Sequence, residues 1–358
     1  MDIKKTSLHA DHLKLNAKMA PFAGFDMPIQ YASVKDEVLA IRQKAGMFDV
    51  SHMGEFFVEG PEAIDFVDYL IPNEFKAAAE NKAVYAPLCR ENGTVVDDLI
   101  AYKVNGQTVL ICVNASNMAK DWTWIHPHAD KFKCRVKNVS DDFSLIAIQG
   151  PQADAVCQKI GLIDKSEFSY FSVKTFKYAN EEIIVARTGY TGEDGFELFC
   201  SHSMAQTLWN QFLNEKVVPC GLASRDVLRL EVCYPLYGHE LNDEITPLDA
   251  GLAWTVKLNK PRFIGKEALQ NYTPHFQQVK LTLDKGVPRA EYPITNRQNE
   301  QIGRITSGTM SPILNKGIAL GLVEKSKMPQ DKKFSITIRD KGHEANYQSK
   351  PFIVGGHK

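Results

Sequence analysis

The sequence predicts an α+β fold of more than one domain, with a small all-β module at its C-terminal end. The chain has 358 residues, which is enough for two or three domains. Before residue 273, some stretches repeat apolar residues with helical spacing and others are β-branched, strand-like runs. After residue 274, short strands separated by turn residues are typical of a barrel or jelly roll. Tyr272-Thr273-Pro274-His275 is the best boundary, and it divides the chain into domains 1–273 and 274–358.

Composition and charge exclude several classes of protein. A formal net charge of −1, with no basic block, argues against nucleic acid as the main partner, because phosphate binding needs clustered lysine and arginine. No apolar run reaches the length of a transmembrane helix, and residues 1–18 lack the apolar core of a signal peptide, so a cytoplasmic location and no membrane partner are expected. The seven cysteines lack metal-ligand spacing and His126-Pro127-His128 has no third ligand nearby, so no metal site is expected.

The N-terminal part of the chain predicts two helices with a strand between them. Residues 34–45 keep apolar side chains at helical spacing, and Pro61 opens a second helix with an apolar stripe. Residues 47–53 between them are strand-like but carry polar side chains.

Two adjacent carboxylates interrupt the next predicted strand, residues 95–104. Asn92-Gly93 is a turn signal directly before it. Side chains alternate between the faces of a strand, so Asp97 and Asp98 point in opposite directions. Both faces are otherwise apolar, and a carboxylate beside an apolar wall needs partners or a function. The strand alone leaves open an edge strand with two solvated acids. The residues that share the two faces are Val95, Leu99 and Ala101 with Asp97, and Val96, Ile100 and Tyr102 with Asp98.

Three further strands and a glycine-rich loop follow. Residues 108–113 are expected to pair with the Asp97 strand, and residues 144–149 and 183–188 form buried-type strands. Residues 188–197 combine three glycines with threonines, a tyrosine and acids. The spacing is not G-x-G-x-x-G and a strand follows, so a dinucleotide-binding fold is rejected. A plain hairpin loop and a backbone that approaches a ligand both remain open.

The remaining elements complete the first domain and the C-terminal module. A helix at 221–231 carries Arg225 and Arg229 one turn apart, as surface ion pairs or as a buried anion site. A strand is expected at 254–258 and a helix at 264–271. The strands expected after residue 274 are 279–283, 302–307, 319–323, 334–339 and 351–354.

Several of these pieces occur together, and in this order, in one family. The chain resembles the T-protein of the glycine cleavage system, a tetrahydrofolate-dependent aminomethyltransferase. The resemblance covers nearly the whole chain. The pieces that carry it are Met47-Phe48-Asp49-Val50-Ser51-His52-Met53, Asp97-Asp98-Leu99-Ile100, Val113-Asn114-Ala115-Ser116, Gln149-Gly150-Pro151, Thr188-Gly189-Tyr190-Thr191-Gly192-Glu193, Arg225-Asp226 with Leu228-Arg229-Leu230-Glu231, and Ser307-Gly308-Thr309.

The resemblance implies both a fold and a reaction. The fold is a three-domain, cloverleaf-like arrangement around a folate pocket, in which a Greek-key domain and a ferredoxin-like domain interleave and a C-terminal β-barrel follows. In the reaction, the partner H-protein delivers an aminomethyl group on its dihydrolipoyl arm. Tetrahydrofolate takes up the methylene carbon, ammonia leaves, and methylenetetrahydrofolate is formed.

The resemblance also implies the site residues. Asp97 matches the carboxylate near the reacting folate nitrogens, where it would act as the catalytic group, and Asp98 would then be structural. Glu197 matches the acid that binds the pterin ring, and Arg225 matches an arginine near the glutamyl end of the ligand. The remaining matches are pocket positions suited to flat rings, namely Met53, Tyr85, Leu88, Asn114, Tyr190, Tyr234 and Trp254.

Two alternatives share the implied fold. One is another tetrahydrofolate-dependent enzyme, a demethylase whose donor is a small molecule rather than H-protein. The other is a folate-binding iron–sulfur maintenance protein, whose Lys-Gly-Cys-Tyr-x-Gly-Gln-Glu signature is absent because Cys233-Tyr234 is followed by Pro235. His239 stands where many T-proteins have Asn or Gln, as a neutral change or one that adjusts the rim of the pocket.

Overall fold

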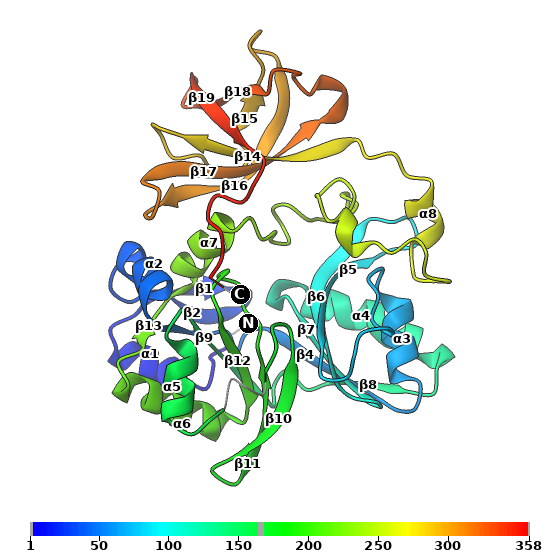
Figure 1. Cartoon of the computed structure of the whole chain (residues 1–358), viewed down its shortest axis with the longest axis vertical. Helices are drawn as coiled ribbons and strands as arrows, with labels where there is room; N and C mark the ends of the chain where they lie inside the picture. The colour runs from blue at the N-terminus through cyan, green and yellow to red at the C-terminus, as the bar shows by residue number, and fades with distance from the viewer. Residues whose placement is uncertain (1–2, 164–167, 357–358) are drawn as a thin grey trace.

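A computed structural model describes residues 3–163 and 168–356. The described residues form a two-stranded sheet of β1 and β2 and three larger sheets, and the larger sheets define three lobes that meet at a common centre (Figure 1). We call them the six-stranded lobe, with strand order β10-β11-β12-β9-β3-β13, the five-stranded lobe, with order β5-β6-β7-β4-β8, and the barrel, with order β14-β17-β16-β15-β18-β19. The predicted α+β class with a C-terminal barrel is confirmed.

The six-stranded lobe is assembled from two separate parts of the chain. Its sheet is antiparallel except for the pairing of β13 with β3. Helices cover the sheet, and Trp209, Phe196 and Phe212 are completely buried in its core. The elements are α1 (His9–Lys14), β1 (Lys18–Phe22), β2 (Phe25–Gln30), α2 (Val34–Gln43), β3 (Gly46–Asp49), β9 (Ser144–Gln149), α5 (Ala153–Lys159), β10 (Val173–Tyr178), β11 (Glu181–Ala186), β12 (Gly195–Cys200), α6 (His202–Asn214), β13 (Val218–Pro219) and α7 (Leu222–Glu231).

The five-stranded lobe is inserted between β3 and β9. Its core packs the helices against one face of the sheet, with Phe56, Phe66 and Ile111 fully buried. The chain returns to this lobe late, when Ile264 joins the same core. The elements are β4 (Gly54–Glu59), α3 (Ala63–Leu70), β5 (Ala83–Cys89), β6 (Val95–Asn105), β7 (Thr108–Val113), η1 (Ala115–Asn117), α4 (Met118–His128), η2 (Ala129–Lys131), β8 (Arg135–Asn138), η4 (Ala253–Thr255) and α8 (Lys266–Gln270).

The barrel closes through six antiparallel strands around an aliphatic core. Two expected strands are wrong. Residues 254–258 form no strand: Trp254 and Thr255 belong to the 3₁₀ turn η4, and the Trp254 ring stacks on Tyr85. Residues 351–354 form no strand, and β19 closes the barrel in their place. The elements are β14 (Phe276–Leu283), β15 (Pro293–Thr295), β16 (Gln301–Ser311), β17 (Lys316–Glu324), η5 (Lys325–Lys327), β18 (Lys333–Ile338) and β19 (Lys341–Gln348).

Helix α7 joins the six-stranded lobe to the barrel through buried charges. Glu231 accepts from Arg42 Nη2 at 2.7 Å and from Ser311 Oγ of the barrel at 2.7 Å. Arg229 donates to Glu240 Oε2 at 3.0 Å and to Ser307 Oγ at 2.9 Å. The reading of Arg229 as a surface ion pair is therefore wrong, since its side chain is 1% exposed. Within the described ranges, no helix is long and apolar enough to cross a membrane.

Candidate active site

Strand β6 presents its two aspartates on opposite faces, as the alternation of a strand requires. Asp98 lines a cavity between the lobes, together with Ile100 and Tyr102 from the same face of the strand. Asp97 lies on the other face and contacts the segment that begins α4. Both side chains are buried, so the reading of β6 as an edge strand with two solvated acids is wrong.

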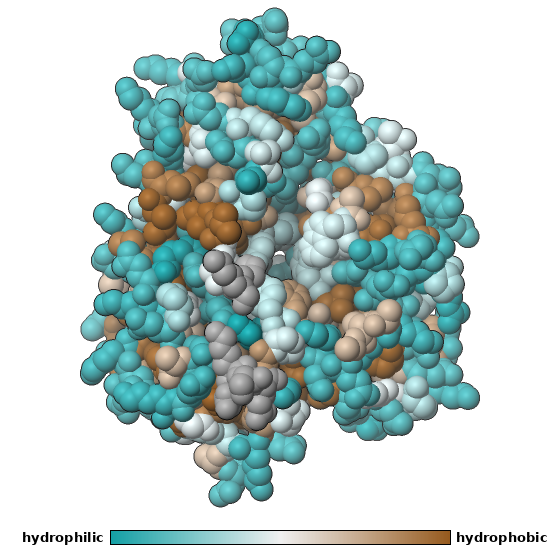
Figure 2. All heavy atoms as spheres, viewed as in Figure 1, coloured by the Kyte–Doolittle hydropathy of each residue, from teal (hydrophilic) through white to brown (hydrophobic). Residues whose placement is uncertain are grey.

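The cavity has two adjoining chambers that share Tyr85, Ile100, Gly189 and Tyr190. The first holds about 80 Å³ and the second about 460 Å³. Figure 2 shows a depression in this face of the molecule where the three lobes meet. The first chamber is also lined by Met53, Asp98, Leu99, Tyr102, Cys112, Asn114, Leu145, Glu197 and Arg225, and the second by aromatic and apolar groups that include Tyr170, Phe171, Tyr234, Leu252 and Trp254.

Two side chains hold the carboxyl group of Asp98 at the wall of the first chamber. Tyr85 Oη donates to Asp98 Oδ2 at 2.9 Å, and Asn114 Nδ2 donates to Asp98 Oδ1 at 2.9 Å. Burial and the neighbouring Asp97 charge raise the pKa of Asp98 to about 7. A carboxyl group with this pKa can exchange a proton near neutral pH, which is what acid–base chemistry requires.

The structure turns Asp97 away from the cavity. Its carboxylate accepts from the Asn114 backbone N–H at 3.1 Å, from Asn114 Nδ2 at 2.9 Å and from Asn117 Nδ2 at 2.6 Å. These donors occupy both of its oxygens on the α4 side of the sheet. Asp98 therefore faces the chamber, whereas Asp97, which was expected as the catalytic carboxylate, contacts the segment that begins α4.

Glu197 and Arg225 lie in the same chamber as Asp98. Thr188 Oγ1 and Tyr102 Oη both donate to Glu197 Oε2, at 2.5 and 3.3 Å, which leaves Oε1 to accept from a ligand. The Arg225 guanidinium lies 4.6 Å from the centroid of the Tyr190 ring. The chamber thus offers a carboxylate acceptor and a guanidinium donor in its lining, which suit a ligand that carries both donor and acceptor groups.

The other predicted pocket residues divide into two groups. Met53, Tyr85, Asn114 and Tyr190 line the first chamber, and Tyr234 and Trp254 line the second. Leu88 does not reach either chamber. It is opposite Asp97 on β5, so it shares the face of Asp97 and packs in the core of the five-stranded lobe.

Several lining residues were not predicted. Ile100 and Tyr102 alternate with Asp98, so the period of the strand could have found them. Cys112 is opposite Ile100 in the sheet, and this pairing is invisible before the strand register is known. Gln278 and Lys280 reach the second chamber from β14 of the barrel, and no local pattern signals that contribution.

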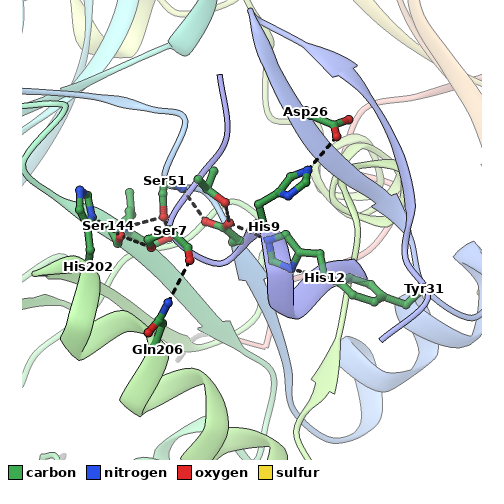
Figure 3. A network of polar contacts seen from close by, with 12 residues as sticks. Ser7, His9, His12, Asp26, Tyr31, Ser51, Ser144, His202 and Gln206 are labelled. Atoms are coloured by element: carbon green, nitrogen blue, oxygen red, sulfur yellow. Dashed lines mark hydrogen bonds and ion pairs between the residues drawn. The ribbon is translucent and has the colours of Figure 1, made fainter. Parts of the chain in front are cut away.

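A buried polar network fixes the segment that carries Met53 into the chamber. Figure 3 shows His12 between Tyr31 and a carboxylate, which is that of Asp49. Asp49 Oδ2 accepts from Thr6 Oγ1 at 2.6 Å and contacts His12 Nε2 at 2.8 Å, while Asp49 Oδ1 accepts from the Ser51 N–H at 2.9 Å. Asp49 and Ser51 of this strand-like piece therefore have partners within the protein, whereas the buried Nδ1 of His52 has no hydrogen-bond partner among the described residues.

Two further sequence features lie outside the chambers. His239 Nδ1 contacts the Thr306 carbonyl oxygen at 2.9 Å, which ties this position to the barrel. In the part of the chain that the structure describes, no group of three or more His, Cys, Asp or Glu side chains could hold a metal ion.

Comparisons with known proteins agree with this architecture. The GCVT N-terminal domain model matches residues 8–260, and the glycine cleavage T-protein C-terminal barrel domain model matches residues 277–353. The aminomethyltransferase of Thermosipho melanesiensis is 43% identical over 361 residues, covering 99% of each chain. That of Staphylococcus carnosus is 40% identical over 345 residues, covering 94% of this chain and 95% of its own. The crystal structure of glycine cleavage system aminomethyltransferase T from Bartonella henselae matches with a TM-score of 0.93 at 31% identity, covering 99% of both chains. The chain belongs to the glycine cleavage T-protein family, the aminomethyltransferases.

Proposed function

We propose that this protein is a tetrahydrofolate-dependent aminomethyltransferase of the glycine cleavage system. It moves the methylene carbon of an aminomethyl group, carried on the dihydrolipoyl arm of H-protein, to tetrahydrofolate. Ammonia is released and methylenetetrahydrofolate is formed. The family membership supports the reaction, and the location is that of a cytoplasmic bacterial-type enzyme.

The observation that carries the site assignment is the Asp98 carboxyl group in the wall of the first chamber. Its two hydrogen bonds fix its direction, and its raised pKa lets it change protonation state near neutral pH. As a carboxylate, Asp98 accepts a proton from the attacking folate nitrogen and stabilises positive charge that develops on the transferred carbon. Asp97 does neither directly, because it faces α4.

Glu197 and Arg225 are assigned to the pterin end of the folate. An amino-pyrimidinone edge offers neighbouring N–H donors and a carbonyl acceptor, which match a carboxylate and a guanidinium placed in one chamber. The resemblance implied the glutamyl end for Arg225; we propose the pterin end because Arg225 and Glu197 line the same chamber. Tyr85, Tyr190, Tyr234 and Trp254 supply the aromatic surfaces that flat rings require.

Ammonia release tests the reaction and the carboxylate together. Purified protein is mixed with tetrahydrofolate and aminomethyl-loaded H-protein, and Asp98→Asn and Asp97→Asn are measured alongside. We expect Asp98→Asn to lower turnover by about 100- to 10,000-fold, which is the usual rate contribution of a general acid or base. Folate affinity should be nearly unchanged. Asp97→Asn should retain more activity than Asp98→Asn.

Two outcomes would contradict the proposal. A larger loss of turnover in Asp97→Asn than in Asp98→Asn would mean that Asp97 is the catalytic carboxylate. Transfer of a methyl group from a small methylated donor to tetrahydrofolate, with no transfer from H-protein, would identify a demethylase instead.

A further inference from the structure

A third buried aspartate, Asp121 on α4, lies behind the two aspartates of β6. Its side chain is fully buried, and among the described residues no amide, hydroxyl or cationic donor reaches either of its oxygens. The group in hydrogen-bond contact with it is the carboxyl group of Asp97. Two carboxylates in contact in a buried site cannot both be charged, so one of the pair holds a proton.

The donors around the pair decide which carboxyl group is neutral. Asp97 accepts three hydrogen bonds from Asn114 and Asn117, which stabilise its ionised form. Asp121 receives none of these donors. Burial and the Asp97 charge raise the pKa of Asp121 to about 11. Asp121 is therefore the proton donor of the pair and Asp97 the acceptor.

The side-chain amide of Asn114 connects the Asp97–Asp121 pair to the carboxyl group of Asp98. The two hydrogens of Asn114 Nδ2 go to Asp97 Oδ1 and to Asp98 Oδ1, each at 2.9 Å. A shift of Asp97 would rotate this amide and remove a donor from Asp98. The other charged or titratable groups that act on the three aspartates are Lys120 of α4, Tyr85 of β5, Cys112 of β7, and Tyr190 and Tyr237 of the loops.

We propose that Asp121 is a positioning residue for aminomethyl transfer: it remains a neutral acid that donates to Asp97, and so fixes the Asn114 amide on Asp98. This role rests on the proposed function. Asp121 lines neither chamber and touches no substrate, so it acts on turnover through Asn114 and not on folate binding.

Two substitutions separate this role from simple packing. Asp121→Asn keeps the shape and supplies an N–H donor to Asp97, so it should retain kcat within about threefold of the wild type. Asp121→Ala removes the donor and should lose about 10- to 100-fold in kcat, the size expected for a small misplacement of a reacting group, with the folate dissociation constant unchanged. Asp130→Asn, on the exposed turn that follows α4, is the matched control.

Infrared difference spectroscopy at pH 8 reads the proton without any turnover. The spectrum of the wild type minus Asp121→Asn should show one neutral carboxyl band that the Asp130→Asn difference lacks. This measurement stands even if H-protein proves not to be the donor, or if Asp121→Ala does not fold. The inference is overturned if that band is absent, if Asp121→Ala keeps wild-type kcat, or if Asp121→Asn is as impaired as Asp121→Ala.

Discussion

At the scale of single residues, the surroundings of Asp98 move its pKa away from the ordinary value of an aspartate. Its pKa is about 7 against an ordinary value of 3.8, because burial and Asp97 both oppose ionisation. In the proposed reaction, the proton transfer thus depends on a carboxyl group that exchanges its proton near neutral pH. Turnover limited by this group should fall as the pH drops below about 7, because the protonated acid cannot accept a proton.

The same raised pKa has a cost in stability that can be measured. Since the folded protein binds this proton more tightly than the unfolded chain, ionised Asp98 destabilises the fold between the two pKa values and above. The penalty is absent below pH 3.8, grows as the pH rises to 7, and is complete above it. Asp98→Asn should remove up to about 4 kcal/mol of this penalty, at 1.36 kcal/mol per pKa unit.

Urea unfolding of the wild type and Asp98→Asn at pH 4 and pH 8 checks this expectation. The variant should be more stable at pH 8, and the gain should be small at pH 4. Asp130→Asn, an exposed carboxylate, should show no such pH-dependent gain. An equal effect of Asp98→Asn at both pH values would mean that the amide, not the charge, changes stability.

Arg225 gives a second prediction at this scale. If its guanidinium meets the pterin, Arg225→Ala should weaken tetrahydrofolate and a tail-less tetrahydropterin by similar factors, since neither interaction involves the glutamyl group. Calorimetric titration of both ligands measures the two factors. A loss confined to the ligand with the glutamyl tail would place Arg225 at the other end of the folate.

Sequence reasoning could predict the faces of β6 from Asp97 onward. It was wrong for Val96, which packs in the same core as Leu99 and Ala101, because the pairing of β6 with β5 is irregular at this point. Alternation alone grouped Asp98 with Ile100 and Tyr102, and all three line the chamber. The choice between the two aspartates needed the position of α4, which covers Asp97 through a contact between residues far apart in the sequence. The family resemblance assigned Leu88 to the pocket, whereas the structure places it in the core of the five-stranded lobe.

At the scale of elements, the glycine-rich loop works through close packing rather than through a phosphate cradle. Strand β12 begins at Gly195, opposite Gln149 of β9. A Cβ at Gly195 would lie 2.2 Å from the Ile148 carbonyl oxygen and 2.6 Å from Gln149 Nε2. The first of these atoms belongs to backbone that is fixed in the sheet. A side chain here would push apart the two strands that place Glu197.

Gly195→Ala should therefore destabilise the protein by about 1–3 kcal/mol, the usual cost of forcing volume into a packed site. It should also weaken folate binding through Glu197. Gly342→Ala is the matched control, because a Cβ at this glycine in β19 meets no atom within 4 Å. Thermal unfolding and folate titration of both variants test this, and equal behaviour of the two would refute it.

The sequence correctly predicted helix or strand where the apolar side chains of an element pack in the core of its own lobe. The helices at α2 and α7 and the strands β6, β9 and β12 follow local periodicity. Residues 254–258 had the composition of a strand, but the Trp254 ring stacks on Tyr85 of another element. The contact between Trp254 and Tyr85, which are far apart in the sequence, outweighs the preference of aromatic residues for strands.

At the scale of the whole molecule, α7 contacts the barrel through buried charged side chains: Arg229 and Glu231 each form a hydrogen bond with a barrel serine, and each is held by an ion pair with a residue outside the barrel. Arg229→Met would leave Glu240 without its cation in a site where the glutamate is completely buried. Breaking such a pair on one side costs about 3–5 kcal/mol. We expect a lower urea midpoint and earlier proteolytic release of the barrel, measured together by pulse proteolysis.

The exposed pair of Arg297 with Asp331 supplies the control for this prediction. Both side chains are more than 40% exposed, so Arg297→Met should cost less than about 1 kcal/mol. If the two arginine variants were equally stable, the buried pairs at α7 would not be what holds the barrel in place.

The insertion of the five-stranded lobe between β3 and β9 has a consequence for how the protein is made. Strand β3 emerges from the ribosome early but pairs with β9, whose residues are synthesised only after the whole of β4 to β8. During that interval the nascent chain carries an apolar strand with open edges, the kind of segment that recruits other chains. The inserted lobe can assemble most of its own sheet meanwhile. Slow synthesis across residues 50–143 should therefore favour aggregation, and chaperone binding to the earliest residues should oppose it.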